Sequence, residues 1–571
     1  MKINSKYIKA LSISLFLITS CSKDFLNKIP QGELSDSQIG NSDGVEAILL
    51  GAYGLMNGNV SGTWDNYAAA PSQWIFGEVA SDNAHKGSEA TDQPDMNLIE
   101  SLRPNPANSN LNFMWQAYYE GVLRCNNTLR ILNEDQANAK TVTAERAIEI
   151  QAEARMLRAH YYFYMWRVFR NIPWVDETIP TEQAITTAND MDIYEHIIND
   201  VKFAIDNLPI EKINGEKGRM DKNIAKAYLG KLYLYQNKYD LALPLFKDVI
   251  GSKDITTMPF ENNFNVETED GPEVVLVSKH AINPNGSGDN SNVGDMLSGL
   301  YGTSPVGCCG FYQPSIDLVN AFKVDENGLP YLDGSYRNDP YTSDMGLSGT
   351  QKSNYKLDKT LKFDPRLDYT VGRRGVPYLD YGIMPGDDWI RNSNYAGPFV
   401  GMKTMVYQSQ FGSYTVPGEA YMTALDVNII RLADVILMAA ECAIEMNDLD
   451  AALKYVNSIR IRASKLSPRL IEGEEAADYQ VKPYISFPDQ NYAREAVRME
   501  RRLELAMEGH RFFDLVRWGI AKEVIESYSA FEGSLLPSFS GVIFNEHNAY
   551  FPIPQTQIDR SSGTLKQNEG Y

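Results

Sequence analysis

The chain has 571 residues and a formal net charge of −21, and 43% of its residues are hydrophobic. A chain of this length can bury a large core, and its length alone would allow several domains. The acidic charge argues against nucleic acid and against a polybasic membrane-binding surface, because phosphate binding needs basic patches. The 33 tyrosines and 7 tryptophans are more suggestive, since many fall in loop-like segments where a ring can act as a flat stacking surface.

The N-terminus has the pattern of an export signal. Three lysines precede an apolar stretch at residues 10–20, which is shorter than the roughly 20 residues that span a bilayer but suits a signal peptide. The stretch ends in ITSC, which resembles the lipobox of bacterial lipoproteins, where the cysteine is acylated after cleavage. We therefore expect a signal peptide at 1–20 and a lipid on Cys21 that holds the protein to a membrane. Cleavage by the ordinary signal peptidase is the alternative.

Apolar residues at helical spacing follow in three segments of the N-terminal part. They predict helices over residues 36–57, 111–132 and 143–169. Thr143 is placed to cap the third helix, although Arg146 stands where a complete capping box needs Glu. Residues 58–110 contain a loop-rich stretch between the first two helices.

Two later segments share the spacing of tetratricopeptide helix pairs. In each, a small residue is followed by an alanine and then by a larger apolar residue, so that two antiparallel helices can approach closely. These residues are Gly230, Ala242 and Phe246 in the first copy, and Ala440, Ala452 and Val456 in the second. A solenoid needs about three repeats, so we expect further, degenerate pairs near 154–159 and 193–208.

The remaining sequence is irregular. Residues 273–278 predict a short strand, and residues 325–420 are rich in Gly, Pro, Asp and Tyr with little helical period. Such a length is unusual for an unstructured connection, so we expect it to pack on the helices and to form a functional surface. The predicted fold is mainly α: tetratricopeptide-like helix pairs near 143–250 and 428–525 form a scaffold, beside a loop-rich binding region near 58–110 and 260–420 that contains a few short strands.

Four cysteines remain if Cys21 is acylated. They are Cys125, Cys308, Cys309 and Cys442. Because Cys308 and Cys309 are adjacent, the spacing argues against a zinc site or a regular disulfide framework. We expect buried thiols, no metal site and no cofactor.

Several blocks spread over nearly the whole chain carry a family pattern. They are EARMLRAHYYFYMWRVFRNIPWV (153–175), PSIDLVNAF (314–322), DPRL (364–367), RLADVILMAAECA (431–443), RMERRLELAMEGHRFFDLVRWG (498–519), FPIPQTQI (551–558) and the closing QNEGY. Together they resemble the SusD/RagB family of Bacteroidota surface lipoproteins. The family fold of tetratricopeptide-like pairs beside a large irregular region agrees with the prediction made from the repeats, and we expect one such domain over residues 21–571.

The longest of these blocks has a structural interpretation. Its apolar residues recur at helical spacing and predict a core-facing stripe, formed by Ala496, Met499, Leu503 and Ala506. The charged residues on or beside the opposite face predict a solvated or ion-paired surface; they are Arg498, Glu500, Arg501, Arg502 and Glu504. Gly509 fits a C-terminal helix cap, and His510 is expected to be buried. The block therefore predicts scaffold and does not locate a binding site.

The resemblance implies a non-catalytic role at the outer membrane. Proteins of this family act as a lid over a SusC-like TonB-dependent transporter and capture an oligosaccharide, or for some members a peptide, on the cell exterior. The sequence has no HExxH, P-loop or GxSxG motif. Two alternatives stay open: a peptide-binding or transporter-docking lipoprotein without glycan affinity, and a surface glycosidase.

Candidate ligand-binding residues are the rings outside the helical stripes. Sugars stack their C–H faces on Trp and Tyr, while polar side chains bind the hydroxyls. The candidates are Trp64, Tyr67, Trp74, Tyr301, Tyr312 and Trp389, with Asn83 and His85 as polar partners. Each ring alone favours packing, and SQWIFGEVA also fits a helix that buries Trp74; as a set, we expect at least two to line the site.

Overall fold

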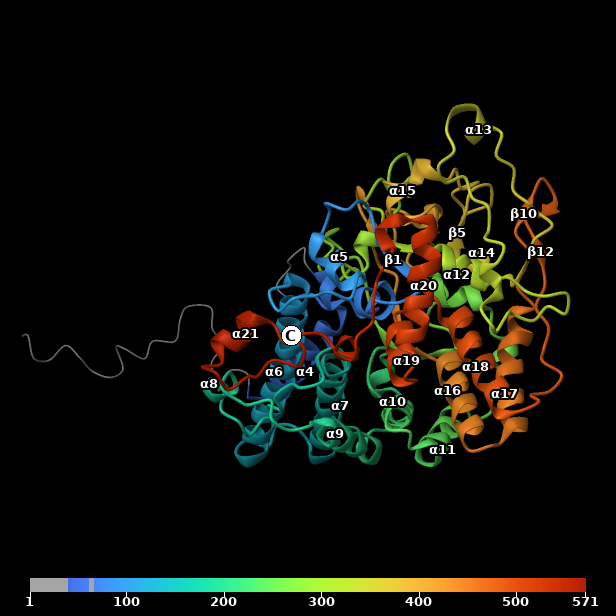
Figure 1. Ribbon diagram of the computed structural model, residues 1–571. Coiled ribbons are helices and arrows are strands. Elements are labelled where there is room, and N and C mark those ends of the chain that lie inside the picture. Colours follow the sequence, from blue (N-terminus) through green and yellow to red (C-terminus); the bar gives the residue numbers. More distant parts are fainter. Residues whose placement is uncertain (1–39, 61–65) are drawn as a thin grey trace, which may run out of the picture.

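The computed structural model describes residues 40–60 and 66–571. The predicted signal peptide, Cys21 and Trp64 lie outside these residues. Helices dominate the described part, and short strands and loops lie above them in the view of Figure 1. The mainly α fold predicted from the sequence is confirmed.

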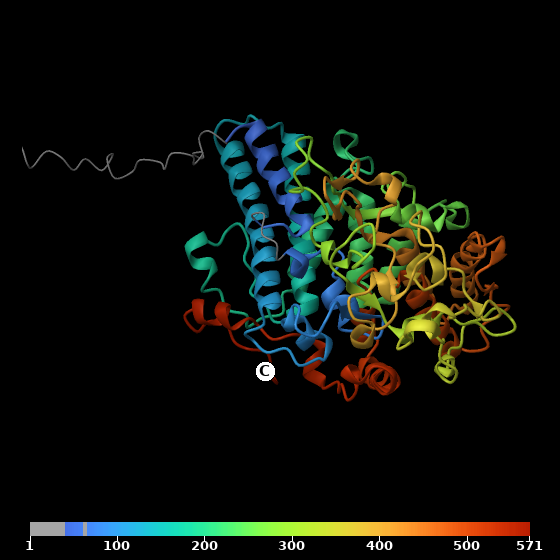
Figure 2. The ribbon, with the colours of Figure 1, turned by 90° about the horizontal axis from the view of Figure 1, so that it is seen from above.

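An array of long helices forms the scaffold. Its members are α4 (Ser42–Gly54), α6 (Ser109–Ala137), α7 (Ala144–Phe169), α9 (Tyr194–Asn207), α10 (Lys222–Tyr235), α11 (Tyr239–Ile250), α16 (Leu432–Glu445), α17 (Leu449–Ala463) and α18 (Gln490–Leu505). From α6 to α11 each of these helices packs on the next. Helix α16 then packs on α11, although a long irregular segment separates them in the chain (Figures 1 and 2). The scaffold is thus continuous in space and interrupted in sequence.

The two predicted repeats are the pairs α10–α11 and α16–α17. In the first, a Cβ added at Gly230 would lie 2.5 Å from the Phe246 ring, so only glycine lets the two helices approach this closely. In the second, Ala440, Ala452 and Val456 are all fully buried. The small-residue spacing therefore identified both helix pairs correctly.

The N-terminal helices begin at well-defined caps. Asn41 and Asn108 cap α4 and α6, and Thr143 accepts a hydrogen bond of 3.3 Å from the Arg146 amide at the start of α7. Helix α4 is shorter than predicted and α6 longer. The cap of α7 is confirmed without the rest of the capping box.

The loop-rich region is built from small elements. Its strands are β1 (Ala84–Gly87), β2 (Val274–Ser278), β3 (Phe311–Pro314), β4 (Lys362–Phe363), β5 (Val371–Gly372), β6 (Val400–Gly401), β7 (Thr415–Val416), β8 (Glu419–Thr423), β9 (Val427–Arg431), β10 (Leu470–Ile471), β11 (Glu474–Glu475) and β12 (Asp478–Tyr479). They form two-stranded sheets within the described residues. Strand β2 confirms the strand predicted at 273–278, and its partner β9 runs directly into α16.

The remaining helices of the described residues lie outside this array. They are α5 (Pro94–Glu100), α8 (Thr181–Ala184), α12 (Ile316–Ala321), α13 (Gly349–Ser353), α14 (Leu367–Thr370), α15 (Ser393–Ala396), α19 (Arg511–Arg517), α20 (Ala521–Leu535) and α21 (Gln555–Arg560). Strand β1 pairs antiparallel with β3, with His85 opposite Gln313. Helices α5 and α15 pack on β1, and α20 reaches it through Glu532, which binds His85 at 2.8 Å. No helix in residues 40–60 or 66–571 is long and apolar enough to cross a membrane.

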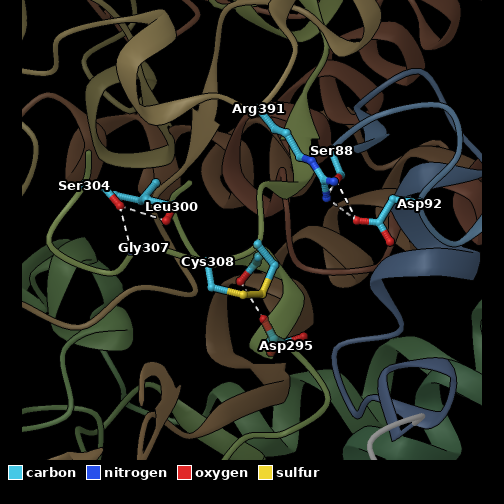
Figure 3. Close-up of a disulfide and its surroundings, with 10 residues drawn as sticks. Ser88, Asp92, Asp295, Leu300, Ser304, Gly307, Cys308 and Arg391 are labelled. Carbon is cyan, nitrogen blue, oxygen red and sulfur yellow. Dashed lines mark hydrogen bonds and ion pairs between the residues drawn. A yellow bond between two sulfur atoms is a disulfide. The ribbon is translucent and has the colours of Figure 1, made fainter. Parts of the chain in front are cut away.

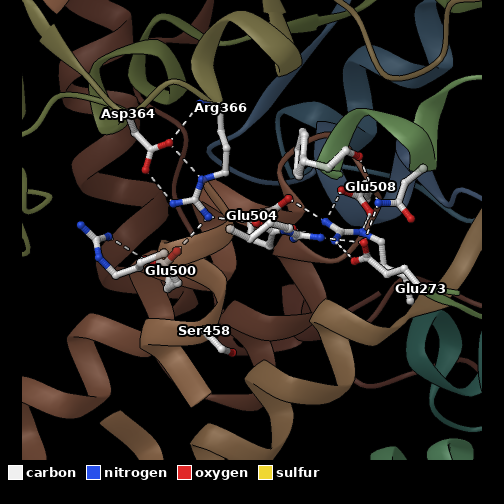
Figure 4. Close-up of polar contacts among 12 residues, drawn as sticks. Glu273, Asp364, Arg366, Ser458, Glu500, Glu504 and Glu508 are labelled. Atoms are coloured by element: carbon white, nitrogen blue, oxygen red, sulfur yellow. Dashed lines mark hydrogen bonds and ion pairs between the residues drawn. The ribbon is translucent and has the colours of Figure 1, made fainter. Parts of the chain in front are cut away.

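The charged face of α18 is buried and not solvated. Glu500, Arg501, Arg502 and Glu504 are at most 3% exposed, and only Arg498 is partly exposed. Glu504 binds three guanidinium groups: Arg431 at 2.6 Å, Arg366 at 2.9 Å, and Arg462 (Figure 4). The predicted ion pairing is confirmed, but the predicted solvation is wrong for these four residues, because other segments of the chain cover that face.

Two of the three guanidinium partners of Glu504 come from separate family-like blocks. Arg366 belongs to DPRL and binds Asp364 of the same block at 2.6 Å, and Arg431 opens RLADV. Burial alone would raise the pKa of Glu504, but the nearby arginines outweigh it and hold the pKa well below its usual range. The network therefore keeps a buried carboxylate ionised and ties α17, α18, β9 and the irregular region together.

Gly509 does not cap α18. The helix ends at Leu505, and Gly509 follows with φ +79°; a Cβ there would lie 1.7 Å from the Ser72 carbonyl oxygen. The glycine is required by this close approach of two backbones, which is a tertiary contact that the local sequence does not reveal. His510 is buried as expected.

Candidate ligand-binding surface

Three of the predicted ring candidates lie in the core. Trp74 and Tyr312 are each 1% exposed, with ring centroids 5.3 Å apart, and the Trp74 indole donates to the Gly294 carbonyl at 3.0 Å. Tyr67 is buried as well, and its hydroxyl donates to Gln93. Trp74 begins a π-helical turn, Trp74–Val79, in agreement with the alternative prediction of a helix that buries Trp74. These rings offer no open face to a sugar in this structure, so their ligand role stays a prediction.

The polar candidates support the strand β1. Asn83 donates to Glu78 at 2.9 Å and accepts from Arg502 at 2.9 Å. His85 lies between Glu100 at 3.1 Å and Glu532 at 2.8 Å. Burial alone would lower the pKa of His85, but the two carboxylates outweigh it and raise the pKa to about 9. Both side chains are fully buried, and every described contact of theirs is structural.

Among the ring candidates that the structure describes, Tyr301 is the one that is partly exposed. It is half-buried, and its backbone amide donates to the Trp389 carbonyl at 3.1 Å. Trp389 itself is buried, edge-on to Tyr378 and Tyr381. The structure thus brings these two predicted residues together, with Trp389 beneath the loop that presents Tyr301.

Charged side chains border the Tyr301 ring. The guanidinium carbon of Arg391 lies 5.3 Å from the ring centroid, within range of a cation–π contact. The same guanidinium binds Asp92 at 2.6 Å and donates to Ser88 (Figure 3). It also binds Glu89 at 2.8 Å. Tyr301, Arg391, Asp92 and Glu89 are all partly exposed, and Ser88 is buried. The tyrosine and these three charged side chains are therefore all open to solvent in part.

A buried lysine holds the acidic loop in place. Lys86 of β1 is fully buried and donates to the carbonyl oxygens of Glu89 at 2.7 Å and Asp92 at 2.5 Å. Burial lowers the pKa of Lys86 to about 8. Its ammonium also lies 5.2 Å from the Tyr395 ring centroid. These contacts of Lys86 therefore fix the position of the loop that carries Glu89 and Asp92.

Cys308 and Cys309 form a disulfide with each other. The prediction of buried thiols is wrong for this pair, which is half-buried, and right for Cys125 and Cys442, which are free and buried. The disulfide, drawn in Figure 3, lies in the same loop as Tyr301, and a Cβ added at Gly310, the next residue, would lie 3.5 Å from the Arg391 Cβ. Adjacent cysteines flanked by Gly307 and Gly310 were the sequence signal for it.

A separate cavity of about 440 Å³ opens beside α6, α8 and α21. Trp115 and Tyr119 line one wall, and Ile185, which is 51% exposed, lies at its edge. The two rings are one helical turn apart on α6, a pattern that the sequence indicates only as a core stripe. This cavity is a further place where a ligand could bind. No cluster of three or more potential metal ligands occurs in the described ranges 40–60 and 66–571.

Comparisons with known proteins agree on one family. The SusD family model matches residues 272–571, and a second model, described as starch-binding associating with outer membrane, matches residues 24–234. SusD-like protein P25 of Formosa agariphila is 23% identical over 91% of this chain and 91% of its own. A SusD-like protein of Bacteroides ovatus is 23% identical over 89% of this chain and 81% of its own.

Solved structures share the fold. A laminarin-binding SusD-like protein has a TM-score of 0.65 at 22% identity, covering 93% of this chain and 100% of that one. Surface glycan-binding protein A from Bacteroides thetaiotaomicron, in complex with laminarihexaose, has a TM-score of 0.64 at 19% identity, covering 92% and 99%. Because the family model covers more than half of the sequence, and relatives align along nearly all of it, the chain belongs to the SusD family.

Proposed function

We propose that this protein binds an oligosaccharide on the outside of the cell and passes it unchanged to a SusC-like TonB-dependent transporter. In this proposal the lipid on Cys21 anchors it to the outer membrane. Family membership supports the proposal, as do the second family description and the relatives named for laminarin and laminarihexaose binding. The transporter, the anchor and the orientation come from the family resemblance.

The surface around Tyr301 is the observation that carries the binding role. A partly exposed aromatic ring offers a stacking face for the C–H side of a pyranose. Arg391 donates hydrogen bonds, and Glu89 and Asp92 accept them, within the same cluster. Lys86 holds the loop that carries Glu89 and Asp92, and Trp389 holds the loop that carries Tyr301. Because these side chains are already positioned before the ligand arrives, the entropic cost of binding is lower.

The test is titration calorimetry of the purified protein with laminarihexaose and maltohexaose. We expect measurable binding of at least one oligosaccharide, and a loss of about tenfold in affinity for Tyr301→Ala, equivalent to about 1.4 kcal/mol. Tyr301→Phe keeps the ring and should stay within about twofold of the wild type. Trp64→Ala belongs in the same series, since its predicted role is untested. If only Ile185→Glu, at the edge of the cavity, abolished binding, the site would be the cavity.

The alternatives make different predictions in the same assay. Binding of peptides without any binding of oligosaccharides would replace the glycan proposal by the peptide-binding one. Shortened products after incubation would show a glycosidase. Co-purification with a TonB-dependent transporter, and protease sensitivity on intact cells, test the partner and the exposure; protection from protease on intact cells would contradict a position on the cell exterior.

A further inference from the structure

The disulfide between Cys308 and Cys309 places a small, rigid, apolar ring on the candidate surface. A bond between adjacent cysteines closes a ring through the intervening peptide, and the side-chain part of that ring consists of sulfur and methylene groups. Sulfur is polarizable and packs well against other apolar groups. Both cysteines are half-buried, so part of this ring is open to solvent.

The backbone holds the disulfide ring firmly. The amides of Cys309 and Gly310 both donate to the carbonyl oxygen of Gly299, at 2.9 and 2.8 Å. The carbonyl of Gly310 accepts from the Ser88 amide at 2.5 Å, which connects the disulfide loop to the end of β1. The loop cannot shift without breaking these bonds, so the disulfide stays fixed relative to the loop that carries Glu89 and Asp92.

Two half-buried tyrosines lie near the disulfide loop. A Cβ added at Gly310 would lie 3.2 Å from the Tyr301 Cβ and 3.5 Å from the Arg391 Cβ. A Cβ added at Gly299 would lie 2.9 Å from the Tyr421 Cβ. Both tyrosines are partly exposed. Tyr301 and Tyr421 therefore both start close to the disulfide loop, Tyr301 at Gly310 and Tyr421 at Gly299, where glycines allow the close approach.

We propose that the Cys308–Cys309 disulfide and Tyr301 together form the floor on which one pyranose ring of a neutral oligosaccharide rests. The floor is apolar and has no hydrogen-bonding group on the disulfide, so it suits a sugar face that presents C–H groups. Arg391, Glu89 and Asp92 border it and bind the hydroxyls at the ring edge. This inference rests on the proposed function and adds which part of the surface contacts the sugar and which class of sugar it accepts.

The charges around the floor select against anionic sugars. Arg391 is already bound to Glu89 and Asp92. Beyond Tyr301, the exposed Asp388 lies next to Lys352, at 3.4 Å, and that lysine also faces Asp387. Carboxylates thus outnumber cations at this rim. A uronic acid or a sulfated sugar would meet net repulsion there, whereas a neutral sugar would not.

The test compares oxidised and reduced disulfide in the intact protein. The phosphine TCEP adds two electrons and two protons to the disulfide, giving two thiols and the phosphine oxide with an oxygen from water. Cys125 and Cys442 are already free thiols. We expect reduction to weaken binding of the preferred neutral hexasaccharide by about tenfold, and reoxidation to restore it. The Cys308→Ser, Cys309→Ser double variant should match the reduced protein, with thermal unfolding measured to confirm the fold.

The outcomes separate this inference from the proposed function. If the wild type binds none of laminarihexaose, maltohexaose or hexagalacturonate, the proposed glycan binding fails. If the wild type binds a neutral hexasaccharide and the reduced and double-serine proteins bind it equally well, only the role of the disulfide is overturned. Preference for hexagalacturonate over both neutral sugars would overturn the charge argument. Reduction that weakens binding irreversibly, with a lowered unfolding temperature, would assign the disulfide a structural role and refute the floor.

Discussion

Replacing Glu504 by glutamine tests the buried network of α18. The side chain is fully buried, and its two oxygens accept from Arg366, Arg431 and Arg462. Glutamine keeps the shape but removes the negative charge and turns one acceptor into a donor that faces a guanidinium. Breaking one partner out of a buried ion pair costs about 3–5 kcal/mol, a large share of a typical folding free energy of about 5–15 kcal/mol.

The assay is urea unfolding followed by circular dichroism, with a control on the same helix. Glu495 is 49% exposed and pairs only with Arg498 in the described structure, so Glu495→Gln should cost less than about 1 kcal/mol. We expect Glu504→Gln to lower the free energy of unfolding by several times the loss seen in the control. Equal losses in the two variants would refute the argument that burial makes this carboxylate important to the fold.

Two further predictions concern β1 and the glycine after α18. The pKa of His85 is raised to about 9 from an ordinary 6.5, so the protonated side chain contributes about 3 kcal/mol to folding, complete below pH 6.5 and lost as the pH rises through 9. Between pH 6 and pH 9.5, urea unfolding should show a larger fall in the free energy of unfolding for the wild type than for His85→Gln. Equal falls in the two proteins would contradict this prediction. Gly509→Ala should destabilise the protein by about 2 kcal/mol or more, because the added Cβ would meet the Ser72 carbonyl. Gly563 has a similar φ of +85° but open space around it, so Gly563→Ala carries only the backbone strain of about 1–2 kcal/mol. An equal loss of stability in the two variants would refute the packing argument.

The scaffold was predictable from sequence because its signals are local. A helix pair needs a small residue at a fixed distance from a larger one, and both Gly230 with Phe246 and Ala440 with Val456 satisfy this rule. The cap at Thr143 depends on one side chain and a nearby amide. Such patterns hold within a few turns of chain, where periodicity and spacing determine the geometry.

The candidate surface was harder to predict because distant segments build it. Trp74 and Tyr312 lie far apart in sequence and pack together, and no local pattern distinguishes such a ring from one that faces solvent. Arg391 acquires its role from Glu89 and Asp92 in a loop some 300 residues earlier. Composition pointed to aromatic residues in loops, but burial depends on which loops meet, and that is decided by tertiary packing.

The buried charges of α18 explain how a scaffold helix can matter to a surface site. The guanidinium of Arg502 lies 3.1 Å from the Asp82 carboxylate and donates to the Asn83 side-chain oxygen at 2.9 Å. Both of these residues come just before β1. Strand β1 in turn carries Lys86, which holds the loop of Glu89 and Asp92. The helix therefore fixes the strand, and the strand fixes the acidic loop beside Tyr301. A substitution at Arg502 would act on ligand binding through position alone, because its guanidinium is buried beneath the surface that we propose binds the sugar.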